Sequence, residues 1–485
     1  MKRLTRSVCI FLCAAALQAQ APDPIKLGDL TVSASLRSRV YFWDWFQPAS
    51  GENSYQYSGN LLRLGLSEKG DTWDWSAEFA VPFLLALPGS ATGTGAQQGA
   101  LGLGANYFSA NSGSQNTAMI FPKNLFVRFD GLGGNKRHTL QIGRFEFLDG
   151  SELAPKNATL AALKRDRVTQ RLIGNFGFSD VGRSFDGVHY SYGTASGNFT
   201  FVGAIPTRGV FQVDGWGWNR VGFGYAAYTK EWGTGRHSAD TRLFAIEYDD
   251  FRHILKTDNR AVAVRRGDLA NIRIETFGGH TLHALQTDAG TVDLLFWGAV
   301  QTGRWGVQTH RAGAFDVEAG FQPKIMAALK PWLRAGYTYG SGDNNPNDNR
   351  HNTFFQLLPT PRPYAKFPFF NTMNTEDRYG TLMLRPHPRV TVTSEFHALR
   401  LTNANDLWYS GGGAYQPWTF GYTGRSSSGR RSLGNLYDLG GEYRVNRHLT
   451  LGQYFGYTQG LAAMEQIYPG GKDGKFGYLE LLTRF

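Results

Sequence analysis

Cysteine is almost absent from the chain of 485 residues, and both copies, Cys9 and Cys13, lie close to the N-terminus. The rest of the chain therefore has no disulfide, no thiolate metal site and no catalytic thiol. Long apolar runs are also missing, except for one over residues 8–17. Because a membrane-spanning helix needs about 20 apolar residues, this pattern excludes a protein built from several membrane helices.

The apolar run follows three basic residues, Lys2, Arg3 and Arg6. A basic head, a short apolar stretch and then small residues are typical of a secretory signal peptide. We expect cleavage near Ala19 or Ala21, so that 1–21 is removed and 22–485 forms the mature domain. The alternative is an N-terminal anchor, but the run is short for a hydrocarbon core of about 30 Å.

Catalytic motifs are missing as well. The sequence contains no G-x-S-x-G, no H-E-x-x-H and no P-loop lysine, so we expect neither an enzyme nor a bound cofactor. Asp343, Asn345, Asn347 and Asn349 alternate in one polar segment and could hold Ca²⁺. A solvated turn is the favoured interpretation of that segment, and Asp343 remains a weak metal candidate.

Apolar and polar residues alternate along many segments. Over residues 30–43, Leu30, Val32 and Leu36 share one parity, while Arg37 and Arg39 share the other. In a strand, the two parities point to opposite faces. The same pattern recurs near residues 62–66, 73–81, 315–321, 333–338, 390–397 and 438–445. An apolar outer band around a polar interior predicts a transmembrane β-barrel. A soluble β-sandwich or propeller, with its apolar face inside, is the alternative.

We count about eighteen strands, with boundaries good to a few residues. Their predicted starts are near residues 30, 57, 73, 124, 138, 184, 197, 219, 240, 272, 291, 313, 332, 377, 389, 436, 449 and 476. Short connections such as 131–137 and 446–448 contrast with long ones such as 84–122, 148–182, 341–376 and 402–435. The predicted fold class is all-β: a transmembrane antiparallel β-barrel with long outer loops and short periplasmic turns, located in a bacterial outer membrane.

The last predicted strand, 476–485, ends on Phe485, with Leu479 and Leu481 on the same face. A terminal aromatic on such a strand resembles the signal that the barrel-assembly machinery recognises. We therefore expect that machinery, together with outer-membrane lipid and lipopolysaccharide, as partners. Nucleic acid is not expected as a partner of an exported chain.

One group of motifs resembles a known family. The sequence has G-R-F-E-F-L-D-G at 143–150, Q-R-L-I-G at 170–174 and G-R-S-F-D-G-V at 182–188. This order is similar to the core of the alginate export family of outer-membrane porins. The segments 335–343, 355–360 and 438–460 resemble later parts of the same family. Phe145 replaces the usual Gln, and the segment 148–182 is longer than in the family pattern.

The resemblance implies an eighteen-stranded, monomeric barrel with a basic pore, and in the founding member the pore passes the anionic polysaccharide alginate. The net charge of +11, which falls to +8 without the three basic residues of the signal peptide, also suits anionic partners. We therefore expect a channel for an anionic saccharide or another small anion. A general porin, or a channel for hydrophobic solutes, is the alternative.

Arginine suits an anion path because its guanidinium stays charged and binds carboxylates with two hydrogen bonds. The candidate pore residues are Arg37, Arg39, Arg63, Arg128, Arg144, Arg171, Arg183, Arg334 and Arg444. Arg144 has the parity of the lipid face, so we expect a β-bulge at Gly143 to turn it inward. Lumen carboxylates, among them Asp149, Asp186 and Glu318, could instead pair with these arginines and stiffen the wall.

The segment 148–182 includes a short basic helix near 158–167. If the segment folds inward, it forms a constriction or gate; the alternative is a solvated lid outside the pore. Large aromatic residues, including Tyr41, Trp43, Trp216 and Trp218, are expected mostly in the two interfacial girdles of the barrel.

Overall fold

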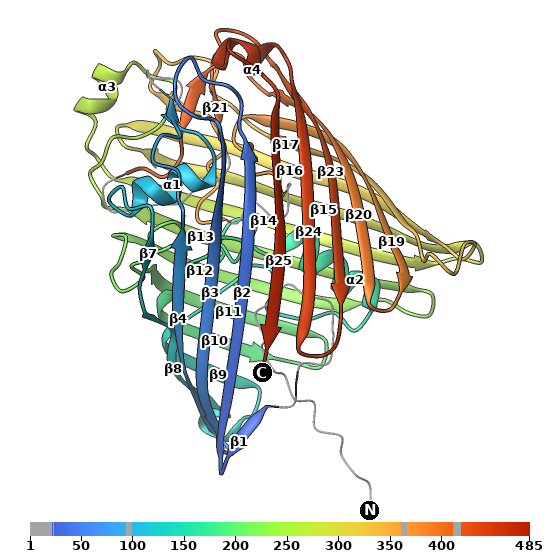
Figure 1. The fold of residues 1–485 in the computed structure, drawn as a ribbon. Coiled ribbons are helices and arrows are strands. Elements are labelled where there is room, and N and C mark those ends of the chain that lie inside the picture. The colour runs from blue at the N-terminus through green and yellow to red at the C-terminus, as the bar shows by residue number, and fades with distance from the viewer. Residues whose placement is uncertain (1–21, 23, 94–98, 360–365, 411–418) are drawn as a thin grey trace, which may run out of the picture.

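The computed structural model describes residues 22, 24–93, 99–359, 366–410 and 419–485. The predicted signal peptide and both cysteines lie outside the described residues. The main sheet closes on itself as an eighteen-stranded antiparallel barrel (Figure 1). Its strands are β2 (Leu30–Asp44), β3 (Ser54–Lys69), β4 (Trp73–Leu85), β8 (Phe121–Asp130), β9 (His138–Phe145), β10 (Phe185–Gly193), β11 (Gly197–Pro206), β12 (Val221–Trp232), β13 (His237–Asp250), β14 (Ile272–Gln286), β15 (Gly290–Trp305), β16 (Gln308–Pro323), β17 (Trp332–Gly340), β19 (Thr375–His387), β20 (Val390–Leu401), β23 (Ser432–Arg444), β24 (Leu449–Gly460) and β25 (Gly474–Arg484).

Pairing of β2 with β25 closes the barrel, in a continuous register from Ser35↔Arg484 to Asp44↔Lys475. The backbone of Phe485 extends this seam, since its N–H donates to the carbonyl of Ala34 at 2.8 Å. Every predicted strand is present, and the strand starts agree with the predicted ones to within a few residues. The prediction of an eighteen-stranded transmembrane barrel is therefore confirmed.

Short elements decorate the barrel. The additional strands are β1 (Ile25–Leu27), β5 (Thr92–Gly93), β6 (Gly99–Ala100), β7 (Thr117–Ala118), β18 (Arg350–His351), β21 (Leu407–Tyr409) and β22 (Gly424–Ser426). The helices are α1 (Leu103–Ala110), α2 (Ala158–Leu163), α3 (Val262–Gly267) and α4 (Ala462–Ile467), with a 3₁₀ turn at Leu132–Gly134 and a π-helical turn at Lys164–Val168. Within the described part of the chain, no helix is long and apolar enough to cross a bilayer.

The two faces of the wall follow the predicted alternation. On β3, Leu64 and Leu66 are exposed on the outside, while Arg63, which directly precedes Leu64, points into the lumen and contacts carboxylates there. On β16, Val317 is exposed, whereas Asp316 and Glu318 are buried inside. The apolar residues of the wall therefore form the outer band that a lipid-facing surface requires.

The girdle prediction is wrong for several of the large aromatics, because Trp332, Trp408 and Tyr409 are buried as well as Tyr41 and Trp43. Tyr41 and Trp43 have the inward parity of β2 and are buried. Trp43 stacks on Phe476 with ring centroids 4.2 Å apart, and Tyr41 stacks on Tyr57 at 4.6 Å. These rings form part of an aromatic cluster inside the outer half of the barrel, because the loops that fold inward give them apolar partners. Trp216 and Trp218 are exposed, as expected for interfacial residues.

The two ends of the barrel differ. The C-terminus and the start of β2 lie at one end, which we call the terminal end, and α1, α3, α4 and β21 lie at the other, the loop end (Figure 1). Turns at the terminal end are short, as between β3 and β4 or between β19 and β20. The connections at the loop end are long, except for the two-residue turn between β15 and β16.

Two long connections from the loop end enter the lumen. We call residues 146–184, between β9 and β10, the strap, and the described residues 341–359 and 366–374, between β17 and β19, the inner loop. The two meet where Ile173 and Leu358 form a parallel β-bridge and the N–H of Gly174 donates to the carbonyl of Leu358 at 2.7 Å. The interpretation of the strap as an outer lid is therefore wrong, and its inward placement is confirmed.

Candidate functional site

The strap crosses the lumen from one wall to the other. On the β2 side, Arg37 donates to the carbonyl of Gly177 at 2.7 Å, and the hydroxyl of Tyr41 donates to Asp180 at 2.9 Å. On the opposite side, Lys164 pairs with Asp240 of β13 at 3.1 Å, and Arg167 pairs with Glu318 of β16 at 2.8 Å. Because these contacts lie on distant strands, the strap divides the lumen and narrows it.

The helical part of the strap forms where the sequence predicted it. The side chain of Asn157 accepts hydrogen bonds from the N–H groups of Thr159 and Leu160, which caps the N-terminus of α2. Leu160 and Leu163 are buried, and α2 contacts β13, β14 and β15. The cap and the apolar face together fix this helix against the wall.

Asp149 holds the start and the return of the strap together. Its carboxylate accepts the N–H groups of Leu172 at 3.1 Å and Ile173 at 3.0 Å, and it pairs with Arg242 of β13 at 3.1 Å. Its side chain and that of Arg242 are fully buried. Burial raises the pKa of Asp149, although the Arg242 guanidinium opposes that shift. The residue therefore has a structural position within the lumen rather than a free carboxylate facing it.

Glu318 lies at the centre of a second network. It contacts Arg167 and Arg171 of the strap and Arg334 of β17. The neighbouring Asp316 pairs with Arg171 and accepts hydrogen bonds from the hydroxyls of Thr338 and Tyr379, and Asp293 of β15 pairs with Arg334. Three arginines thus face three carboxylates, so the network adds no net charge to the constriction.

The other wall arginines that the sequence singled out for the pore are also paired, apart from Arg144, which is described below. Arg39 contacts Glu480 at 2.6 Å, Arg63 contacts Glu78 and Glu146, Arg128 contacts Asp74 at 2.7 Å, and Arg444 contacts Glu442 at 3.3 Å. Arg37 lies 3.5 Å from Asp180. These arginines therefore pair with lumen carboxylates, as the alternative interpretation expected. A positive electrostatic field in the lumen has to come from other residues.

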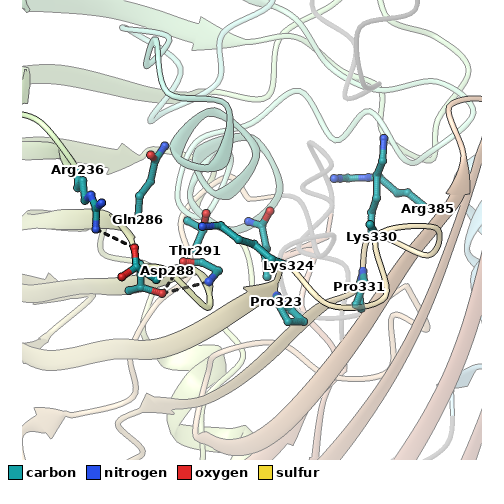
Figure 2. A pocket seen from close by; sticks show the side chains of 13 residues that line it. Arg236, Gln286, Asp288, Thr291, Pro323, Lys324, Lys330, Pro331 and Arg385 are labelled. Carbon is teal, nitrogen blue, oxygen red and sulfur yellow. Dashed lines mark hydrogen bonds and ion pairs between the residues drawn. The ribbon is translucent and has the colours of Figure 1, made fainter.

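A hollow of about 630 Å³ at the terminal end supplies such a field (Figure 2). It is bounded by the turns after β12, β14 and β16 and by the end of β19. Arg236, Lys324, Lys330 and Arg385 line it, and we call these four residues the basic vestibule. Asp288 also lines the hollow and pairs with Arg236 at 3.0 Å.

Arg385 is the vestibule residue with guanidinium nitrogens that an anion could bind. Its Nε and Nη2 atoms are buried and have no hydrogen-bond partner among the described residues. The charges that act on it come from Asp166, Arg165 and Arg444, two cations against one anion. The guanidinium lies 6.0 Å from the ring centroid of Trp332.

Sequence reasoning missed this vestibule. Lys324 and Lys330 lie in the turn between β16 and β17, and Arg385 lies near the end of β19. The available signal was the gathering of basic residues on neighbouring turns, which becomes visible only when the strand order is known.

The sequence of the chain matches a known protein family. A family model described as alginate export matches residues 106–457. The chain belongs to the alginate export family. No curated protein matches the sequence. Membership and the closed barrel together make the protein an outer-membrane β-barrel channel. Since the periplasmic turns of such barrels are short, we assign the terminal end to the periplasm.

Solved outer-membrane porins have similar folds. The structure of Pseudomonas aeruginosa OccK9 (OpdG) matches with a TM-score of 0.57 and 11% identity, covering 94% of this chain and 98% of that one. Acinetobacter baumannii OccAB4 matches with a TM-score of 0.54 at 7% identity, and P. aeruginosa OpdK with 0.54 at 9%, each with the same coverage of 94% and 98%. At these identities the likeness concerns the fold alone.

The arginines of the family motifs lie at different positions in the structure. Arg183 is buried at the end of the strap and donates to the carbonyl of Pro359 in the inner loop at 3.1 Å. Arg171 belongs to the Glu318 network. These two arginines therefore join the strap to the inner loop and to the wall.

Arg144 and Asp186 do not face the lumen. The register of β9 is continuous with both neighbours, and Arg144 shares the parity of the exposed Ile142. The expected bulge at Gly143 is therefore wrong, because the positive φ of Gly143 (125°) is accommodated without shifting the register. Arg144 pairs with Asp186 at 2.7 Å beneath the loop that carries Trp216.

Asp343 acts as a turn residue. Its Oδ1 accepts the N–H of Asn345 at 3.1 Å, and the side chain of Asn345 repeats this pattern with Asn347. Asp343 does not belong to a cluster of metal-ligating side chains within the described ranges. The hydrogen bonds identify the segment as a turn, although Asp343 itself is buried rather than solvated.

Proposed function

We propose that the protein is an outer-membrane channel for solutes that carry carboxylates, and that its preference for anions is set in the basic vestibule. The observation that carries the proposal is Arg385, whose buried guanidinium edge lacks a hydrogen-bond partner among the described residues. Lys324 and Lys330 add positive charge beside it. Rings of Lys and Arg at a narrow point favour anions, because they replace part of the hydration that the anion loses.

The constriction suggests a size limit. The strap is held by buried ion pairs to β13 and β16, so the lumen in this conformation suits small solutes. A uronate polymer would need the strap to move away from the wall. One structurally similar protein, P. aeruginosa OpdK, has a structure with vanillate, which is a small aromatic carboxylate. Small carboxylates are therefore the first cargo to test, and uronate oligomers the second.

The test is reversal-potential measurement in planar bilayers under a KCl gradient. We expect chloride to be more permeant than potassium in the wild type. The double variant Arg385→Gln, Lys330→Gln should lower the ratio of chloride to potassium permeability several-fold, since it removes the unpaired charge. Lys472→Gln is the control, because that lysine pairs with Glu465 in an outer loop.

Blocking experiments then identify the cargo. Vanillate or short uronate oligomers, added on the periplasmic side, should reduce the current in the wild type more than in the double variant. A wild-type channel that prefers cations, or one whose selectivity survives the double substitution, would contradict the proposal and favour a general porin.

A further inference from the structure

Another polar cluster lies near the middle of β20 and β23, on the lumen face of the wall. It consists of Glu395, His397 and Asp438, each of which offers one ligand atom, and these atoms all lie within 4.8 Å of one another. Glu395 and Asp438 are directly opposite in the β20–β23 register, and His397 is two residues further along the same face. Like charges placed opposite one another destabilise a sheet, so the pair calls for a cation between them.

His397 is held in an orientation that suits a metal ligand. Its Nδ1 lies 2.7 Å from Asp377 of β19, and its ring stacks on Tyr379 with centroids 5.6 Å apart. The side chain is fully buried, and Nε2 has no hydrogen-bond partner among the described residues. A carboxylate on one imidazole nitrogen is the arrangement that orients metal-binding histidines and raises their basicity.

Asp438 offers a second unsatisfied group. It is 5% exposed, and neither of its carboxylate oxygens has a hydrogen-bond partner in the described part of the chain. The Tyr454 hydroxyl of the neighbouring strand β24 and the Lys366 ammonium both interact with it electrostatically. Glu395 accepts a hydrogen bond from Thr381 at 3.1 Å through Oε1 and is only half-buried, so solvent in the lumen can reach the cluster.

We propose that Glu395, His397 and Asp438 bind one divalent transition-metal cation of the Zn²⁺ class, with Asp377 as the positioning residue for His397. A point exists within about 2.8 Å of all three ligand atoms, whereas a bond to Zn²⁺ is about 2.1 Å. Side-chain shifts of less than about 1 Å therefore complete the site. Three protein ligands leave at least one position for water from the lumen. The proposal is independent of the anion preference proposed above.

The test uses the full mature barrel, purified in detergent without a polyhistidine tag and stripped with a chelator. Titration calorimetry with ZnCl₂ should show one equivalent bound, and Co²⁺ should give a visible absorption band from a low-symmetry site. Asp438→Asn and His397→Gln should each weaken Zn²⁺ binding by at least about tenfold, and Asp377→Asn by about 10- to 100-fold. Lys366→Gln should strengthen it, because the lysine competes with the metal for Asp438.

Glu442→Gln is the matched control, since this carboxylate lies on the same strand and face four residues away. Heat-dependent mobility in electrophoresis shows which variants are folded, and Glu395→Gln is a third ligand variant if His397→Gln does not fold. A wild type that binds no Zn²⁺, or that binds it equally well after Asp438→Asn, would overturn the proposal. If the wild type binds no Zn²⁺, the cluster is better described as a protonated His397 surrounded by carboxylates.

Discussion

Arg334 shows how a lumen residue depends on partners from several strands. Its guanidinium contacts Asp293 of β15 and Glu318 of β16, while Arg167 from the strap shares the same Glu318. Parity along β17 was enough to predict that Arg334 points inward. Its ion-pair partners depend on the register between neighbouring strands and on the position of the strap. The alternation of residues along β17 predicts neither of them.

Removal of Arg334 should therefore be costly. In Arg334→Met, Asp293 and Glu318, both with fully buried side chains, lose a shared cation. We expect the free energy of unfolding to fall by about 3–5 kcal/mol, the usual effect of breaking a buried pair by removing one partner. Urea unfolding in detergent, followed by tryptophan fluorescence, measures the change.

Arg236→Met is the comparison for that experiment. The Arg236 and Asp288 side chains are 74% and 93% exposed, and exposed pairs contribute about 0–1 kcal/mol. Equal losses in the two variants would show that the Glu318 network does not stabilise the barrel.

At the scale of the element, the inner loop is anchored through His351. Its ring stacks on Trp305 of β15 with centroids 4.0 Å apart, and its Nδ1 lies 2.9 Å from the Nδ1 of His310. Two facing nitrogens need one donor and one acceptor, so the contact requires a neutral ring. Burial, reinforced by the Arg260 guanidinium, lowers the pKa of His351 to about 3.

This pKa predicts that acid loosens the inner loop. The opened loop takes up a proton near pH 6.5 and the folded loop does not, so stability is complete above that pH and falls as the pH drops toward 3. The opening free energy should decrease by about 1.4 kcal/mol per pH unit below about 6.5. Hydrogen exchange of the Phe354 and Phe355 amides, corrected for intrinsic rates, measures it at pH 7.5 and 5.

His351→Gln should be less stable at pH 7.5 and should show a smaller dependence on pH. His448→Asn, in a periplasmic turn, should behave as the wild type does. An opening free energy of the wild type that is unchanged between pH 7.5 and 5 would refute the anchoring role of His351.

Strands and turns were predictable because each depends on local sequence. Alternation of the kind seen around Leu64 and Arg63 is set by the strand period, and the basic helix of the strap has its own cap at Asn157. The placement of Arg144 was not predictable, since Gly143 permits a bulge without requiring one. The inward direction of Tyr41 and Trp43 follows from the strand period, but their burial depends on apolar partners contributed by loops that follow much later in the chain.

At the scale of the whole molecule, the strap determines the width of the lumen. Deletion of residues 153–169 removes α2 and the contacts of Lys164 and Arg167 with the wall. Single-channel conductance should then rise at least about twofold, because the constriction opens along the axis of the barrel. Recordings in planar bilayers compare the deletion variant with the wild type.

A deletion of 261–266 in the outer loop that contains α3 provides the control, since none of the side chains of that helix is buried. Unchanged conductance after removal of 153–169 would mean that the current bypasses the strap. An unchanged conductance would not contradict the eighteen-stranded fold, because the fold does not depend on the position of the strap.

The seam between β2 and β25 is joined to the strap by a shared arginine. Arg39 joins Glu480 across 441 residues of sequence, and the same guanidinium donates to the carbonyl of Phe178 in the strap. One guanidinium of the first strand therefore binds both the last strand and the strap. These contacts offset part of the entropy lost when so long a loop of chain closes.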